Sequence, residues 1–373
     1  VSSFLLVNDE ACIFIEGIRI INDSSTEKLR INFIAVLFKL FFLALFILKM
    51  HQGDNTLCRN QFFSMKEKWT YKDIPRMDGK VAIVTGANSG IGFYTAKGLA
   101  EKGCTVIMAC RNRSKTVEAM AKLKEMIGQP RIDFLELDLA DLSSIKAFTE
   151  RFAASYESVD LLINNAGLMA LPYRKTVDGF EMQFGVNHLG HFALTAQLFP
   201  LIIKNAGARI VNIASAAHNA GRIRFEDINW EKKYNKWGAY GMSKLANILF
   251  TLELAGRIKE RGLDVLAAAS HPGYAFTSLM EKGTEMGGSR SILTITNIAG
   301  RLIAQTPEMG ALPTLYAATS RDAQQGGYYG PGGFAKMKGY PELTHPNRRK
   351  IDRNSQTALW TLSEELTGIS FPV

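Results

Sequence analysis

Residues 80–92 read Lys-Val-Ala-Ile-Val-Thr-Gly-Ala-Asn-Ser-Gly-Ile-Gly, and this stretch decides the fold. Its first half is a short apolar run rich in β-branched residues, which is typical of a buried strand in a parallel sheet. Its second half is a glycine-rich turn, and residues 93–102 then have the composition of a helix. A strand, a glycine turn and a helix in this order predict a unit that binds a dinucleotide.

The glycines of the turn have separate functions in such a unit. Gly86 allows the tight turn, Gly90 lets the backbone approach a pyrophosphate, and Gly92 lets the helix pack closely on the strand. The helix N-terminus then supplies N–H groups and a positive dipole end to the phosphates. We therefore expect cofactor contacts at Gly86, Asn88, Ser89, Gly90, Ile91 and Gly92.

The end of the next strand, predicted at 105–110, indicates which dinucleotide is bound. NAD sites usually place Asp or Glu about 20 residues after the glycines, where the acid holds the ribose 2′-hydroxyl. Here Arg111 takes that place, with Arg113 and Lys115 behind it. Arginine pairs well with a phosphate, so the sequence favours NADP over NAD.

A second motif, Tyr240-Gly241-Met242-Ser243-Lys244, carries the chemistry. On a helix, its phenol and its ammonium share one face because they are four residues apart. A cation beside a tyrosine favours the phenolate, so we expect Lys244 to lower the pKa of Tyr240 from its ordinary value of about 10. Such a tyrosine could pass protons to and from a carbonyl oxygen.

The arrangement of apolar runs predicts the fold class. Runs rich in Val and Ile alternate with helical stretches, which is the pattern of an α/β fold with a single Rossmann-type, doubly wound parallel sheet flanked by helices. The predicted strands are 81–85, 105–110, 132–136, 160–164, 209–214, 264–269 and 327–329.

In these motifs the sequence resembles the short-chain dehydrogenase/reductase family over residues 75–330, and the retinol dehydrogenase-like branch within it. The resemblance implies a catalytic set of Asn187, Ser215, Tyr240 and Lys244, in which Asn187 positions a proton-relay water and Lys244 also holds the nicotinamide ribose. It also implies further cofactor contacts, at Asp138, Leu139, Asn165, Ala166, Gly167, Pro272, Gly273 and Thr277.

The resemblance and the motifs together predict an NADP-dependent oxidoreductase that interconverts a carbonyl and an alcohol. Apolar residues between Ser278 and Gly310 indicate a lipophilic small-molecule substrate, either retinoid-like or an aromatic aldehyde or ketone. Two alternatives stay open: a catalytically silent NADP-binding scaffold or sensor, and a light-driven reductase of a tetrapyrrole. The complete set of four catalytic residues argues for catalysis.

Charge and composition exclude other classes of function. The net charge of +9 comes from dispersed residues with no basic run interleaved with aromatics, so we expect no nucleic-acid partner. The four cysteines, at 12, 58, 104 and 110, have no metal-ligand spacing, and we expect reduced thiols. We expect no metal site either, and His188 and His191 should pack in the core or against a neighbouring subunit of a homo-oligomer.

Two terminal extensions flank the predicted catalytic domain. Within residues 1–64, the apolar segment 31–48 is just long enough to span a bilayer, and flanking charge would keep the enzyme domain cytoplasmic. A second interpretation is that the native chain begins at Met65. Residues 331–373 form a C-terminal extension, in which 355–366 is predicted to be a docking helix that stops at Gly368.

Overall fold

The computed structural model describes residues 68–273, 305–333 and 336–373. The chain divides into two compact units, residues 1–66 and 67–373, and the description below concerns the second. The predicted bilayer-spanning segment 31–48 and Thr277 lie outside the described residues, as do the predicted apolar positions between 279 and 303. Within the described ranges, no helix has both the length and the apolar character needed to cross a membrane.

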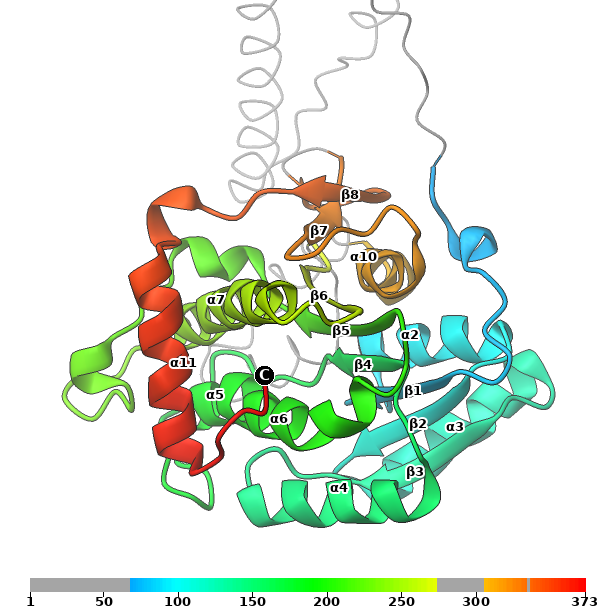
Figure 1. Ribbon diagram of the computed structural model, residues 1–373, viewed down its shortest axis with the longest axis horizontal. Helices are drawn as coiled ribbons and strands as arrows, with labels where there is room; N and C mark the ends of the chain where they lie inside the picture. The colour runs from blue at the N-terminus through cyan, green and yellow to red at the C-terminus, as the bar shows by residue number, and fades with distance from the viewer. Residues whose placement is uncertain (1–67, 274–304, 334–335) are drawn as a thin grey trace, which may run out of the picture. The chain divides into compact units, whose positions relative to one another are not determined.

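The described chain forms one eight-stranded sheet, in the order β3-β2-β1-β4-β5-β6-β7-β8 (Figure 1). Strands pair in parallel from β3 to β7, and β8 joins the edge antiparallel to β7. The strands are β1 (Val81–Thr85), β2 (Thr105–Cys110), β3 (Ile132–Glu136), β4 (Leu161–Asn164), β5 (Ala208–Ile213), β6 (Val265–Ser270), β7 (Tyr328–Pro331) and β8 (Pro341–Thr344). The predicted doubly wound α/β fold is confirmed, and β8 is an addition that the sequence did not indicate.

Helices cover both faces of this sheet. The longer ones are α2 (Gly90–Glu101), α3 (Arg113–Ile127), α4 (Leu142–Ser155), α6 (Gly190–Ile202), α7 (Lys236–Glu260), α10 (Pro307–Thr319) and α11 (Arg353–Thr367), and the short elements are α5 (Met182–Phe184), η2 (Tyr71–Asp73), η3 (Gly185–Leu189), η4 (Ala216–Asn219), η5 (Phe225–Asp227) and η7 (Arg348–Lys350).

Strand residues alternate between two cores, as the two-residue period of a strand requires. In β1, Ile83 belongs to the core beneath α4, α6 and α7, whereas Ala82 and Val84 belong to the core beneath α2, α3 and α10. Because both faces are buried, β1 is a continuous apolar run rather than an alternating one.

The helix after the glycine turn begins earlier than the sequence indicated. Helix α2 starts at Gly90 rather than at residue 93, so the last two glycines of the turn lie in its first turn. The backbone N–H groups at this helix end therefore come from the glycine turn itself, which places them at the carboxyl end of β1.

The predicted C-terminal helix is present and packs against the body of the unit (Figure 1). Asp352 caps its N-terminus by accepting a 2.8 Å hydrogen bond from Ser355 N, and Gly368 ends it in the left-handed conformation at φ 67°. Trp360 on α11 is 2% exposed and packs against Phe192 of α6 and Phe250 of α7. Helix α11 thus forms an outer layer over α6 and α7.

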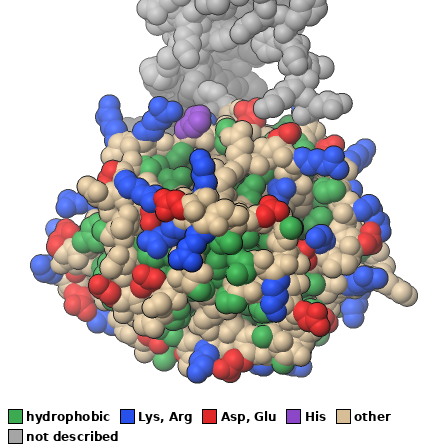
Figure 2. All heavy atoms as spheres, in the orientation of Figure 1, with side chains coloured by type: hydrophobic (Ala, Val, Ile, Leu, Met, Phe, Trp, Pro, Cys, Tyr) green, Lys and Arg blue, Asp and Glu red, His purple; other side chains and the backbone are tan. Residues whose placement is uncertain are grey.

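The surface carries both signs of charge. On the face shown in Figure 2, the side chains of Lys and Arg are interspersed with those of Asp and Glu. An interspersed pattern produces no extended field of one sign on that face.

Candidate functional site

A cavity of about 870 Å³ lies at the carboxyl ends of the parallel strands, where α/β sheets bind their ligands. Every predicted cofactor residue that the structure describes lines it: Gly86, Asn88, Ser89, Gly90, Ile91, Gly92, Arg111, Asp138, Leu139, Asn165, Ala166, Gly167, Tyr240, Lys244, Pro272 and Gly273. Residues spread over almost 190 positions of sequence thus meet around one space.

The glycine turn is shaped for a phosphate group. Gly86 has φ 66°, which favours glycine, and a Cβ on Gly92 would collide with the carbonyl oxygen of Gly86. Ser89, which precedes α2, makes no side-chain capping bond to the helix. The first N–H groups of α2 therefore remain available for an anion in the cavity, and the turn fits the pyrophosphate of a dinucleotide.

Thr85, at the end of β1, joins this turn to the segment after β4. Its Oγ1 accepts hydrogen bonds from the backbone N–H groups of Asn165 and Ala166, both at 2.9 Å. In return, Nδ2 of Asn165 donates to the carbonyl oxygen of Thr85 at 2.8 Å. These bonds hold two sides of the cavity in a fixed relation.

The cavity wall after β2 carries basic side chains. Arg111 and Lys115 line the cavity, whereas Arg113 lies over the ring of Phe134, 5.5 Å from its centroid. The Arg111 side chain is 70% exposed and its NH1 lies 3.5 Å from Oδ2 of Asp138. An exposed ion pair of this kind contributes about 0–1 kcal/mol, so Arg111 can readily exchange it for a phosphate.

Ser215, Tyr240 and Lys244 meet on another part of the wall. Tyr240 and Lys244 share one face of α7, and Nζ of Lys244 lies 5.9 Å from the centroid of the Tyr240 ring. Ser215 follows β5 and precedes η4, where its Oγ accepts a 3.2 Å hydrogen bond from Ala217 N. The end of β5 and the first turns of α7 thereby present a hydroxyl, a phenol and an ammonium to the same space.

Burial sets the protonation of this group. It raises the pKa of Tyr240 above its ordinary value of 10.0, and a hydrogen bond with Ser215 opposes that rise only in part. Burial also lowers the pKa of Lys244 from 10.5 to about 8. The prediction that the pKa of Tyr240 is lowered is therefore wrong for the ligand-free protein, because removal of the phenolate from water raises this pKa and the bond with Ser215 offsets the rise only in part. At neutral pH the phenol keeps its proton.

The ammonium of Lys244 has unused donor capacity. Among the described residues, its Nζ donates to the carbonyl oxygen of Ile213 at 2.9 Å, and this oxygen also accepts a 3.0 Å bond from Nδ2 of Asn247. An ammonium carries three donors, so a buried one beside a cavity fits a ligand with hydroxyl groups such as a ribose.

Asn187 lies behind the cavity wall rather than on it. It sits in the π-helical turn η3 and is fully buried. Its Oδ1 accepts a 2.7 Å bond from Leu168 N, and its Nδ2 donates to Leu168 O and to Ser243 Oγ, both at 2.9 Å. A Cβ on Gly167 would lie 3.2 Å from Oδ1 of Asn187 and 3.4 Å from Nζ of Lys244. The amide thus fixes the segment that separates it from the cavity.

The two histidines near Asn187 have structural partners, and the expectation that they pack in the core is confirmed. Nδ1 of His191 lies 3.0 Å from Asn187 O, and its Nε2 lies 2.9 Å from Oγ1 of Thr85, so His191 links η3 to β1. Nε2 of His188 lies 2.9 Å from Ser363 Oγ on α11. Burial lowers the pKa values of His188 and His191 to about 3 and about 4, so both rings are neutral at physiological pH.

In the part of the chain that the structure describes, no group of three His, Cys, Asp or Glu residues could hold a metal.

Several residues of the cavity wall were missed by the sequence analysis. They come from η4, from the first turn of α7 and from the segments around β6, β7 and β8: Ala216, Ala217, His218, Asn219, Trp237, His271, Tyr328, Lys336, Met337, Thr344 and His345. Proximity to Ser215, Tyr240 or Pro272 was a signal for the residues up to His271, whereas the sequence offered no signal for those from Tyr328 to His345.

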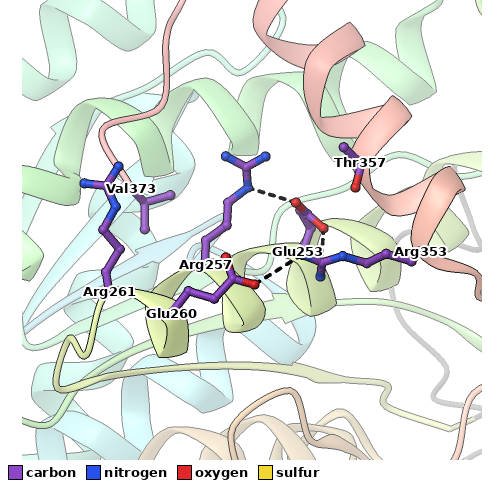
Figure 3. Close-up of a pocket in the computed structure, with 7 residues that line it drawn as sticks. All are labelled: Glu253, Arg257, Glu260, Arg261, Arg353, Thr357 and Val373. Atoms are coloured by element: carbon purple, nitrogen blue, oxygen red, sulfur yellow. Dashed lines mark hydrogen bonds and ion pairs between the residues drawn. The ribbon is translucent and has the colours of Figure 1, made fainter.

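A smaller hollow of about 380 Å³ between α7 and α11 is built from ion pairs instead (Figure 3). Glu253 is 1% exposed, and its carboxylate lies between Arg257 Nε at 2.9 Å and Arg353 NH1 at 3.2 Å. Arg353 also reaches Glu260 at 3.5 Å. These charges neutralise one another and fasten α11 to α7, which accounts for the hollow without a ligand.

Comparisons with known proteins agree with this arrangement. A family profile described as short chain dehydrogenase matches residues 80–287. The chain is 42% identical to retinol dehydrogenase 13 of Homo sapiens, over 79% of this chain and 86% of that protein. It is 44% identical to retinol dehydrogenase 11 of Mus musculus, over 65% and 74%.

Solved structures give the same picture. A protein from Mycobacterium paratuberculosis matches with a TM-score of 0.67 and 41% identity, over 82% of this chain and 100% of that one. A short chain dehydrogenase from Shigella flexneri complexed with NADP matches with a TM-score of 0.53 and 21% identity, over 67% and 96%, which is a likeness of fold alone.

Proposed function

The chain belongs to the short-chain dehydrogenase/reductase family and is an oxidoreductase of alcohols and carbonyl compounds, and we propose that it is NADP-dependent, with Ser215, Tyr240 and Lys244 acting on a lipophilic substrate. The observation that carries this proposal is the convergence of these three side chains on a cavity whose other end holds the uncapped N-terminus of α2.

The proposed mechanism assigns one step to each side chain. The bound cofactor supplies or accepts the hydride. Ser215 Oγ donates a hydrogen bond to the substrate oxygen, where negative charge develops during reduction. Tyr240 then gives its phenolic proton to that oxygen, and it takes the proton back when an alcohol is oxidised. Because burial raises the pKa of Tyr240, the phenol is protonated at neutral pH and is ready for the reductive direction.

Lys244 and Asn187 support the proton transfer by Tyr240 indirectly. Lys244 would hold the nicotinamide ribose through the N–H donors that Ile213 does not use. Once these donors are paired and the site excludes water, a positive charge close to the Tyr240 ring stabilises the phenolate that forms after proton transfer. Asn187 keeps the segment at Gly167 and Leu168 in place. We propose that Asn187 also positions a water molecule that relays the proton.

The choice of NADP rests on the wall after β2. Arg111 and Lys115 are cations where NAD-specific relatives of this fold carry an acid. Asp138, the acid closest to Arg111, is tied to the backbone by accepting a 3.0 Å bond from Ala140 N. A 2′-phosphate would therefore meet two cations, Arg111 and Lys115.

The lipophilic character of the substrate is supported by the names of the relatives and by the cavity. Two of the relatives are retinol dehydrogenases, at 42% and 44% identity. Trp237 lines the cavity and is 56% exposed, so it offers an aromatic surface to an apolar group.

The proposal also covers localisation and assembly: the catalytic unit is cytoplasmic, is attached to a membrane through residues 31–48 and assembles as a homo-oligomer. Carbonate extraction and sedimentation of the full chain test these two points.

The catalytic proposal is tested by following NADPH oxidation with a panel of aldehydes and ketones that includes retinal. We expect turnover by the wild type and a loss of at least about 10²-fold in Tyr240→Phe, which keeps the ring and removes the hydroxyl. NADPH binding and the unfolding temperature should be unchanged in that variant. Near-normal turnover by a folded Tyr240→Phe protein would contradict the assignment, and NADPH binding without turnover of any substrate would favour a silent scaffold.

A further inference from the structure

One wall of the cavity, next to Ser215, is formed by aromatic rings. Tyr328 on β7 is 4% exposed and packs in a small cluster with Ala214 and Ile248. The ring of His218 meets it edge-on at 5.6 Å, and the ring of His271 lies against it at 5.1 Å. These three rings line the same cavity as Ser215 and Tyr240.

The two histidines of this wall form hydrogen bonds with backbone atoms. Nδ1 of His218 lies 2.6 Å from Ser215 O and its Nε2 accepts from Asn347 N at 3.4 Å, so both ring nitrogens are used. Nδ1 of His271 accepts from Gly273 N at 3.2 Å, and the imidazole lies so close to Gly330 that a Cβ there would overlap it. Both rings are therefore held in place and cannot turn toward a ligand.

Tyr328 differs from its neighbours because its hydroxyl is buried and, among the described residues, has no hydrogen-bond partner. Removing a hydroxyl from water without a partner costs about 1–3 kcal/mol, and such groups in native proteins call for an explanation. The adjacent Tyr329 shows the ordinary solution, since its hydroxyl accepts a 2.6 Å bond from Gln324 N.

The hydroxyl of Tyr328 does not act as a second acid. Burial, reinforced by Tyr240, raises the pKa of Tyr328 far above its ordinary value. The phenol therefore stays neutral and keeps its proton at neutral pH. A neutral phenol can donate one hydrogen bond and accept another, which suits recognition rather than proton transfer.

We propose that Tyr328 is a specificity-determining residue whose hydroxyl binds a second oxygen of the substrate, close to the carbonyl that reacts at Ser215 and Tyr240. Among lipophilic carbonyl compounds, those that carry a neighbouring carbonyl or hydroxyl group should then be turned over more efficiently than analogues that lack this second oxygen. This inference rests on the proposed function, because it places the reacting carbonyl at Tyr240.

The test compares substrates that differ by one oxygen. Benzil and deoxybenzoin have the same two rings, and the second carbonyl of benzil is a methylene in deoxybenzoin; diacetyl and butanone form the corresponding small pair. We expect Tyr328→Phe to lower kcat/KM for benzil and diacetyl by about 10-fold or more, with little change for deoxybenzoin and butanone. The two members of a pair differ in intrinsic reactivity, and comparing the ratio between variants cancels that difference.

Tyr329→Phe is the matched control, since it deletes the same atom from the next residue of β7. It should leave the substrate ratios unchanged but lower the free energy of unfolding, because Gln324 N then has no acceptor. Tyr328→Phe should leave the unfolding of the ligand-free protein unchanged or make it less favourable. A loss of stability in Tyr328→Phe as large as that in Tyr329→Phe would reveal a structural partner and overturn the inference, whatever the activity.

The outcomes separate the inference from the function beneath it. If Tyr328→Phe lowered kcat/KM equally for both members of each pair, or for neither, the proposed role of Tyr328 would be overturned. Turnover of these substrates by the wild type would still support the proposed function. Failure of the wild type to reduce any member of either pair would count against this substrate class, and turnover of retinal in the same assay would show that the proposed function still holds.

Discussion

Lys244→Met is expected to stabilise the ligand-free protein while abolishing its activity. Lys244 is 4% exposed, and burial lowers its pKa from 10.5 to about 8, which corresponds to roughly 3 kcal/mol of destabilisation of the charged form. Methionine fills a similar volume without charge. The carbonyl oxygen of Ile213 loses the bond from Lys244 but keeps the one from Asn247, so no acceptor is left unpaired. With about 1 kcal/mol subtracted for the lost hydrogen bond, we expect a net gain of roughly 2 kcal/mol at pH 7.

The pH dependence identifies the cause of this gain. Below pH 8 the lysine is protonated in the folded and the unfolded chain, and the folded state carries the whole desolvation penalty. Between pH 8 and 10.5 the unfolded chain binds a proton that the folded chain has released, so the stability of the wild type rises with pH. The advantage of Lys244→Met should therefore shrink across this window.

Urea unfolding of both proteins without cofactor, at pH 7 and again near pH 10, measures the effect. At pH 7 the midpoint of thermal unfolding should rise by roughly 3 °C for about 2 kcal/mol in a unit of this size. Saturating NADPH should stabilise the wild type much more than the variant. A variant that is less stable than the wild type at pH 7, or a gain that does not change with pH, would refute this account of Lys244.

Three further results are expected. Arg111→Asp should shift the ratio of NADPH to NADH affinity toward NADH by at least about 10-fold in a binding titration, because a carboxylate replaces the cation that faces the 2′-phosphate, and an unchanged ratio would exclude Arg111 from that contact. Glu253→Ala should lower the free energy of unfolding by about 2–3 kcal/mol, because Arg257 and Arg353 lose the buried carboxylate that they share. Glu260→Ala removes an exposed pair and should cost less than about 1 kcal/mol, and equal losses would show that the burial of Glu253 has no effect. Exhaustive treatment with a chelator should leave turnover intact, since Ser215 and Tyr240 supply the groups that act on the substrate oxygen, and loss of turnover that a divalent ion restores would contradict this.

The sequence predicted the fold well where structure is decided locally. The strand at 81–85, the glycine turn and the helix that follows form one continuous signal, and the parallel strands read as apolar runs because both faces of each are buried. Strand β8 was not predicted, because Pro341-Glu342-Leu343-Thr344 has neither a run of β-branched residues nor a clean alternation of apolar and polar residues. This segment is a strand because it pairs with β7.

The site was predicted where spacing is enough and missed where three-dimensional contacts decide. Tyr240 and Lys244 are neighbours on any helix. The position of Asn187 in its π-helical turn depends instead on hydrogen bonds with Leu168 and Ser243, which are distant in sequence. The direction of the pKa shift of Tyr240 was wrong because burial cannot be read from a motif. Tyr328 was missed because its signal is a buried hydroxyl with no hydrogen-bond partner among the described residues, and a sequence does not show hydrogen bonds.

The order of strands in the sheet has a consequence for synthesis on the ribosome. Strand β1 pairs with β2 through Val81 and Thr105, but its other neighbour is β4, which it meets through Ala82 and Leu161 about 80 residues later. At roughly 5–20 residues per second, the growing chain spends about 4–16 s with one edge of β1 unpaired. An apolar, unpaired strand edge is a template for aggregation, so the nascent chain is prone to aggregate during this interval.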